Sequence, residues 1–503
     1  MKLNRRKNSI RNAFYGTIYK CVGILGPFAV RTAIIYTMGN EYVGLSSLFT
    51  SLLSYLSLAE LGAGTALVFS MYKPIAEEDT EAINALYNLY RKVYRIIGVI
   101  IAALGIAIIP FLKLIVNKDV PDDINFYILY LIYILNTVLS YWLYAYKQSL
   151  LTAFQRTDII SKRSLVVQLT MYIVQILTLT LTHNYYLYIL WLPVATVVTN
   201  IANKIIVDKM FPQFKCEGKV SKEVEQSIKK KIMALFGTKA NSIVMHATDN
   251  IVISAFLGLK VVGRYGNYYY IMNSVALFVK IFYASITAGL GNSLQTESKE
   301  KNYSDFKMLT FLNSWVIMFC STCLLCLYQP FMKIWVGKKS MYGLDIAILL
   351  VIYFYVYMMR RIVLTYKDAA GLWWEDRFRP YVVMFVNLGL NITLCQVIGL
   401  YGIILSTIIS MIIAVPWENY TVFKYLFHEK SGSYYFTMAF CCLVSVGIMG
   451  GTWFICNKFM EGILGIAIRL IICVIVPNLV WVILFHNKKE YDRAKKMLLG
   501  KRG

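Results

Sequence analysis

The sequence predicts an all-α, polytopic membrane protein with about fourteen transmembrane helices, and three observations lead to this prediction. Hydrophobic residues make up 58% of the 503 residues and charged residues only 16%, with a mean hydropathy of +0.57, whereas a soluble globular chain is about 45–50% apolar and about 25% charged. Apolar runs of about 20 residues recur from end to end, each long enough to cross a hydrocarbon core about 30 Å thick. These runs are continuous and lack the alternation of a membrane β-barrel. A soluble enzyme, a secreted disulfide scaffold and a disordered chain are therefore excluded.

Charged breaks between the apolar runs delimit the predicted helices in order. Short loops join them, except for one charged stretch at 204–231 that separates the first six spans from the rest. The predicted spans are 12–36, 44–71, 93–116, 124–146, 164–182, 185–203, 232–256, 263–294, 309–332, 346–366, 380–398, 400–423, 433–457 and 462–485.

A weak internal repeat predicts how these helices are grouped. At one constant offset, Ile34, Gly39, Val43 and Gly44 match Ile253, Gly258, Val262 and Gly263, and Lys20 matches Lys239. We therefore expect two six-helix lobes and two additional helices, an arrangement typical of transporters whose substrate site lies between duplicated halves. The predicted parts are an N-terminal lobe at 1–203, a cytoplasmic linker at 204–231, a C-terminal lobe at 232–428, and two extra helices with a basic tail at 429–503.

The net charge of +24 has an explanation in membrane topology. In a soluble protein such a charge would indicate nucleic-acid binding. Here most Lys and Arg residues fall in the loops on the side of the N-terminus, as they do on the cytoplasmic side of membrane proteins. We therefore expect both termini to be cytoplasmic, and no nucleic-acid partner is needed.

The sequence contains no recognisable catalytic, cofactor or metal motif. There is no P-loop and no G-x-S-x-G motif, and the four histidines lack the spacing of metal ligands. Cys320, Cys323 and Cys326 form the run CSTCLLC, but it lies in an apolar segment without a fourth thiol nearby, so we interpret it as packing. We expect a transporter rather than an enzyme, with no cofactor and no metal.

Charged residues inside the predicted spans are the candidates for function, because an unpaired charge at mid-membrane costs at least about 2.5–3.5 kcal/mol. Cations outnumber acids among them, so pairing alone does not neutralise them. A wet cavity with surplus positive charge suits an anionic substrate such as a phosphate, which arginine binds through two parallel hydrogen bonds. The candidate substrate-binding residues are Lys20, Arg31, Lys239, Lys280, Arg360 and Arg361, and the candidate coupling residues are Glu60 and Asp249.

Other interpretations of these charges remain open at this point. Arg360, Arg361 and Glu418 lie near the cytoplasmic ends of their spans and could extend to the interface instead. Adjacent helical residues point about 100° apart, so at most one of the two arginines points squarely into a cavity. Glu60 or Asp249 could simply neutralise a buried lysine.

One stretch, RTAIIYTMGNEYVGLSSLFTSLLSYLSLAELGAGTALVFSMYKPIAEED from Arg31 to Asp79, resembles the Wzx-type polysaccharide flippases. These belong to the multidrug/oligosaccharidyl-lipid/polysaccharide (MOP) exporter superfamily. The resemblance rests on Arg31 in the first span, a G-x-E-Y-x-G-L loop at 39–45, a L-x-x-L-x-L-x-x-L-G-x-G helix ending at Gly64, and Tyr-Lys-Pro at 72–74. The later segments GNSLQTESKE, IWVGKK, KDAAGLWWEDRFRP and GLYGI agree with it, so it covers nearly the whole chain.

The resemblance implies a MATE-like fold and a function. The protein would move an undecaprenyl-pyrophosphate-linked oligosaccharide to the outer leaflet of the bacterial plasma membrane, for capsule or exopolysaccharide synthesis. The last two helices would help to form a hydrophobic groove for the lipid tail, and a polysaccharide polymerase and glycosyltransferases would be partners.

Three alternatives to this function stay open. A cation-coupled drug exporter of the same superfamily would need a cavity dominated by acids, whereas this sequence predicts one dominated by bases. A lipid II flippase is a second alternative. A membrane polysaccharide polymerase, which is an enzyme, would need a sizeable extracellular loop, but the longest loop here is predicted to be cytoplasmic.

Overall fold

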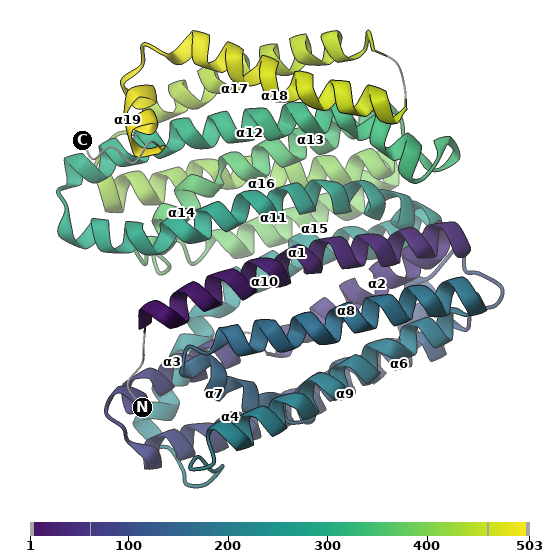
Figure 1. The fold of residues 1–503 in the computed structure, drawn as a ribbon, viewed down its shortest axis with the longest axis vertical. Helices are drawn as coiled ribbons and strands as arrows, with labels where there is room; N and C mark the ends of the chain where they lie inside the picture. The colour runs from purple at the N-terminus through teal and green to yellow at the C-terminus, as the bar shows by residue number, and fades with distance from the viewer. Residues whose placement is uncertain (1–4, 61, 460–461, 499–503) are drawn as a thin grey trace. The chain divides into compact units, whose positions relative to one another are not determined.

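The structure is a computed structural model that describes residues 5–60, 62–459 and 462–498, and every regular element in these ranges is a helix (Figure 1). Eleven of these helices are long and apolar enough to cross a membrane, or twelve if the bent pair Phe126–Trp142 and Ala145–Ala153 is one span. The helices α10 and α11, of 36 and 38 residues, carry more polar residues and are not among these. The all-α, polytopic fold predicted from the sequence is confirmed.

The chain divides into two compact units, Met1–Gly263 and Arg264–Gly503. The first unit contains α1 Arg5–Thr37, α2 Asn40–Leu56, η1 Ser57–Ala59, α3 Ala63–Ala76, α4 Thr80–Ile108, η2 Ile109–Phe111, α5 Leu112–Ile115, α6 Phe126–Trp142, η3 Ala145–Lys147, α7 Gln148–Ala153, α8 Thr157–Thr182, α9 Tyr185–Met210, α10 Lys222–Leu257 and the first turn of α11 Leu259–Thr296.

The second unit contains the rest of α11 and the helices that follow it. These are α12 Lys299–Trp335, η4 Lys338–Ser340, α13 Leu344–Met359, α14 Arg361–Ala369, α15 Arg379–Ile398, α16 Leu400–Val422, the π-helical turn η5 Phe423–Phe427, α17 Gly432–Cys456, α18 Ile463–Phe485 and α19 Lys489–Leu498. The last of them, KEYDRAKKML, is short and mostly charged.

Within the first unit, α2 is a central helix against which several others pack. The helices α1, α6 and α10 all pack against it, while α1 also lies along α8 (Figure 1). Its side chains Leu45, Leu48 and Phe49 are fully buried and form a core with Tyr130 of α6. The outward faces carry exposed leucine, isoleucine and valine, as expected where the solvent is lipid. The sequence predicts that a linker at 204–231 divides the two lobes. In the structure α10 packs on α2, and the first compact unit extends to Gly263.

The repeat seen in the sequence coincides with a close contact in this unit. Gly39 and Gly258 precede α2 and α11 with φ angles of 120° and 96°, a conformation that favours glycine. Gly44 and Gly263 then let the two helices approach closely, since a Cβ on Gly44 would lie 2.1 Å from the Leu259 carbonyl oxygen and one on Gly263 would lie 1.9 Å from that of Asn40. The matched glycines therefore have matched structural roles.

Two of the predicted spans are broken at a charged residue. The span 44–71 is interrupted after α2 by η1 and by Gly62, which has a φ of 82°. The span 346–366 is interrupted at Arg360, between α13 and α14. Both breaks place charged side chains, Glu60 and Arg360, where the helical hydrogen-bond ladder stops.

In the second unit, α12 packs against α13, α17, α18 and α19, and α15 packs against α16. The thiols of Cys326, Cys456 and Cys473, on α12, α17 and α18, lie within 4.8 Å of one another and are buried. They join the two C-terminal helices to α12. The last cysteine of the run CSTCLLC therefore lies next to two cysteines that are distant along the chain.

Candidate functional site

Three of the predicted cations lie on two helices of the first unit. Lys20 and Arg31 belong to α1, where Lys20 is exposed and Arg31 is half-buried, and Lys239 is exposed on α10. Lys20 and Arg31 are eleven positions apart in the sequence, so they share one face of α1 about 16 Å apart. Both α1 and α10 pack against α2, which brings the two cationic helices to a common neighbour. Arg31 lies within electrostatic range of Tyr188 on α9.

Glu60 lies at the break between α2 and α3 and is held by tyrosines rather than by a lysine. The hydroxyl of Tyr94 donates to Oε1 at 2.8 Å, and that of Tyr141 donates to Oε2 at 2.9 Å. Tyr90 in turn donates to the Tyr94 hydroxyl at 2.9 Å. Gly64 leaves room for this cluster, because a Cβ there would lie 2.7 Å from the Tyr94 oxygen. The carboxylate is thus solvated by phenols inside the bundle.

Asp249 lies in a polar interface between α10 and α2. It is 3% exposed and lies within electrostatic range of Tyr55 on α2. On either side of it, the Thr248 and Tyr55 hydroxyls bond to each other, and Asn250 Nδ2 donates to Ser51 Oγ at 2.9 Å. Both candidate coupling acids therefore belong to the unit that holds Arg31, at the same end of α2.

In the second unit, Lys280 and Arg361 form two cation–tyrosine pairs between α11 and the α13–α14 segment. Lys280 Nζ lies 4.8 Å from the ring centroid of Tyr357, and Arg361 lies within electrostatic range of Tyr283. Residues 280 and 283 share one face of α11, as do 357 and 361 on the facing segment. Among the described residues, neither cation has a carboxylate partner.

The guanidinium of Arg361 also keeps an unused donor. Its Nε is buried and has no hydrogen-bond partner among the residues that the structure describes. Buried polar groups in proteins are nearly always hydrogen-bonded. An unsatisfied cationic donor, with a second cation on the facing helix that has no carboxylate partner among the described residues, is chemically suited to an anion. Phosphate oxygens bind such groups strongly.

Arg360, the neighbour of Arg361, points elsewhere and is already neutralised. Its Nε lies 3.0 Å and its Nη2 2.5 Å from the two carboxylate oxygens of Glu418 on α16. Arg379 Nη1 lies 2.9 Å from the same carboxylate. The two adjacent arginines diverge, as the 100° step of a helix requires. Glu418, 1% exposed, is an internal ion-pair partner and does not extend to the interface.

This ion pair continues into a five-residue network that the sequence did not reveal. Asp376 accepts hydrogen bonds from Arg379 Nε and Lys367 Nζ, both at 2.7 Å, and all of these side chains are buried. Burial alone would raise the pKa of Asp376, but hydrogen bonds and attraction from Arg379 and Lys367 outweigh it and lower that pKa. The network ties the segment KDAAGLWWEDRFRP to α16. That segment is one of those on which the resemblance to the flippases rests. The resemblance was the only feature of the sequence that singled out these residues.

An open, apolar groove of about 430 Å³ lies between α17 and α18. Gly447 and Gly451 open it, since a Cβ at either position would meet no atom within 4 Å. Its walls are aliphatic, with only Thr452 contributing a hydroxyl. Its chemistry suits a hydrocarbon chain.

Comparison with solved structures identifies the fold. Lipid II flippase MurJ, in an inward closed conformation, matches with a TM-score of 0.69 at 15% identity, covering 94% of this chain and 99% of that one. An inward-facing multidrug resistance MATE family transporter of the MOP superfamily matches with a TM-score of 0.59 at 12% identity, covering 80% of this chain and 93% of that one. No protein-family model matches the sequence, and no curated protein sequence does.

At these identities the likeness concerns the fold. The chain shares its fold with this flippase and with this multidrug resistance transporter. The predicted MATE-like fold class is confirmed.

Proposed function

We propose that the protein is a flippase that moves a polyprenyl-pyrophosphate-linked oligosaccharide repeat unit across the bacterial plasma membrane, for cell-surface polysaccharide synthesis. The observation that carries the proposal is the pair of intramembrane cations Lys280 and Arg361. They are faced by phenols instead of carboxylates, and a buried guanidinium donor remains unsatisfied. A pyrophosphate would supply the acceptors and the negative charge that this pair lacks.

The apolar groove and the comparisons support a substrate with a lipid tail. The groove between α17 and α18 has the apolar lining that a polyprenyl chain requires. The flippase neighbour matches a larger share of this chain, 94%, than the MATE neighbour does, 80%. That difference is expected if the two C-terminal helices belong to a flippase architecture.

In this proposal the cations divide the work. Lys280 and Arg361 of the second unit are the proposed ligands of the pyrophosphate. Lys20, Arg31 and Lys239 of the first unit are further candidates, in a transporter whose two six-helix lobes alternate their access. Arg360 is committed to Glu418 and has a structural role. Glu60 or Asp249 couples transport to a proton or another cation. A polymerase and glycosyltransferases of the same pathway are the expected partners, and both termini are cytoplasmic.

A cation-coupled drug exporter is the second candidate, and Glu60 is the observation that favours it. A carboxylate held by Tyr94 and Tyr141 inside the bundle could exchange a proton for a cationic drug. Against this, Lys280 and Arg361 would repel such a drug. The two functions predict opposite charges on the cargo.

The test is neutralisation of the cations in cells that depend on the protein. Each charge-assisted hydrogen bond contributes about 1.5–3 kcal/mol, so Lys280→Gln or Arg361→Gln should lower transport at least about tenfold at normal expression. Lipid-linked repeat units should then accumulate in the inner leaflet. Lys338→Gln, at an exposed cation, is the control. Normal transport by well-folded Gln variants would contradict the proposal.

A further inference from the structure

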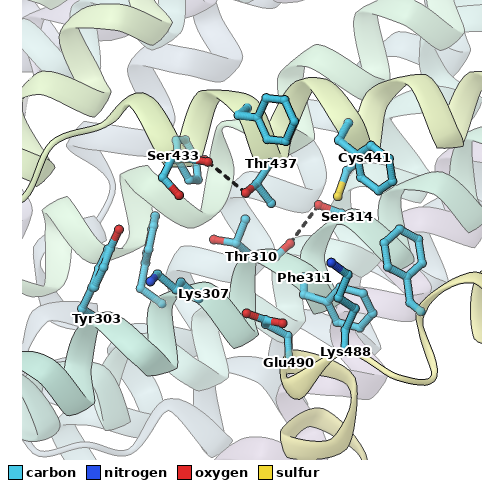
Figure 2. Close-up of a pocket in the computed structure, with 15 residues that line it drawn as sticks. Tyr303, Lys307, Thr310, Phe311, Ser314, Ser433, Thr437, Cys441, Lys488 and Glu490 are labelled. Atoms are coloured by element: carbon cyan, nitrogen blue, oxygen red, sulfur yellow. Dashed lines mark hydrogen bonds between the residues drawn. The ribbon is translucent and has the colours of Figure 1, made fainter.

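A second cavity, of about 240 Å³, lies entirely within the second unit, between α12, α17 and the α18–α19 connection (Figure 2). It is lined by a mixture of aromatic rings and hydroxyl groups, with Lys307, Lys488 and Glu490 as its charged residues. It is smaller than the roughly 300–1,000 Å³ of a typical ligand pocket. A lipid-linked oligosaccharide would not fit, but one small polar group would.

One face of α12 supplies the polar wall. Tyr303, Lys307, Thr310 and Ser314 follow one another at helical spacing along this face (Figure 2). The Ser314 hydroxyl donates to the Thr310 carbonyl oxygen at 2.9 Å. The Thr310 hydroxyl itself is buried and has no partner among the described residues. A buried hydroxyl that lines the cavity and lacks a partner indicates that a polar ligand completes it.

The α18–α19 connection supplies the second cation, and packing fixes its position. Arg493 Nη2 of α19 forms an ion pair with Asp305 Oδ1 of α12 at 2.6 Å. On α12, Trp315 contacts Tyr491 ring to ring at 6.1 Å and donates its indole N–H to Asn478 of α18 at 2.8 Å. Lys488 lies between these anchors. The backbone that carries Lys488 is therefore anchored beside the cavity.

The surroundings indicate what kind of ligand the cavity meets. Phe436 and Phe440 of α17 line it and are 76% and 46% exposed, so they face lipid. The polar end of the cavity adjoins α19, a charged helix that follows the last span directly. Lysines next to aromatic residues at the end of a span are typical of the headgroup region.

We propose that this cavity binds the headgroup phosphate of one anionic phospholipid. Lys307 and Lys488 supply positive charge, the Thr310 hydroxyl donates to a phosphate oxygen, and Phe436 and Phe440 pack against the upper acyl chains. Two lysines and Glu490 leave one net positive charge, which matches the net charge of the phosphatidylglycerol headgroup, whereas the choline group of phosphatidylcholine cancels its phosphate charge. Phosphatidylglycerol therefore fits the site, and zwitterionic phosphatidylcholine does not.

The experiment uses the full-length protein in detergent, incubated with phosphatidylglycerol or phosphatidylcholine and examined by native mass spectrometry. The wild-type protein should retain one phosphatidylglycerol with at least a tenfold preference. The double variant Lys307→Gln/Lys488→Gln should lose the preference, while Lys430→Gln/Lys495→Gln, at exposed lysines outside the cavity, should keep it. Thr310→Val, which keeps the shape of the side chain, should weaken retention several-fold.

Three results would overturn the inference. The first is that the wild-type protein shows no preference between the two headgroups, a result that does not depend on the folding of any variant. The second is an equal loss of retention in the control double variant. The third is displacement of phosphatidylglycerol by a polyprenyl phosphate at equal concentration, which would assign the cavity to the transported substrate instead.

Discussion

Glu418 offers a sharp test of the charge assignments, because its removal should damage stability rather than substrate binding. Glu418 is 1% exposed. Its carboxylate oxygens lie 3.0 and 2.5 Å from Arg360 Nε and Nη2, and one of them lies 2.9 Å from Arg379 Nη1. Glu418→Gln keeps the side-chain shape but leaves both arginines facing an amide. The network would then hold three cations against Asp376 alone.

The magnitude follows from the cost of an uncompensated buried charge. Breaking a buried ion pair by removing one partner costs about 3–5 kcal/mol, so Glu418→Gln should lower the free energy of unfolding by that amount. Arg360→Met should cost less, because Glu418 retains Arg379. The double variant Arg360→Met/Glu418→Gln should be less destabilised than the sum of the two single variants, since the interaction between them is counted once.

The assay is reversible unfolding in bicelles, followed by steric trapping, with transport measured per folded molecule. Glu429→Gln, at an exposed acid next to α17, is the control and should leave stability unchanged. Wild-type stability of Glu418→Gln would refute the assignment. A stable Arg360→Met variant that has lost transport would instead make Arg360 a substrate ligand.

Three further predictions concern topology, packing and the thiol cluster. With both termini cytoplasmic, Lys338→Cys should react with an impermeant maleimide added outside and Lys222→Cys should not; equal labelling would overturn this topology. Gly44→Ala should destabilise the protein by about 1–3 kcal/mol or more, the usual cost of overpacking, because its Cβ meets a backbone oxygen. Gly23→Ala, with open space around it, should be neutral or stabilising by up to about 1 kcal/mol in the same unfolding assay. The Cys326, Cys456 and Cys473 cluster should purify without bound metal if it is packing, and one zinc or copper ion per chain by elemental analysis would contradict that interpretation.

The sequence was sufficient to predict the fold, because a membrane helix can be recognised from its own local sequence. A continuous apolar run must form a helix in lipid, since no water is present to satisfy its backbone. The positions of Gly39 and Gly258 were likewise visible as a repeat, and both have positive φ angles.

The pairing of side chains was not visible in the sequence, because it depends on contacts between distant helices. Nothing in the local sequence around Arg360 distinguishes it from Arg361, yet one meets Glu418 and the other lies near Tyr283. Similarly, the sequence shows Glu60 and Asp249 alike as isolated acids inside predicted spans. Only the structure shows that tyrosine hydroxyls bind Glu60. The break at Gly62 was also missed, since a single glycine is common inside membrane helices.

Reconstituted transport tests the central claim most directly. Proteoliposomes would carry a fluorescent undecaprenyl-pyrophosphate-linked oligosaccharide, and an impermeant glycosidase would report which leaflet holds it. We predict that the wild-type protein exchanges the label between leaflets and that Lys280→Gln/Arg361→Gln does so at least tenfold more slowly. Absence of exchange by a folded wild-type protein, in vesicles where it exports a lipophilic cation against a proton gradient, would contradict the account and establish the drug-exporter alternative.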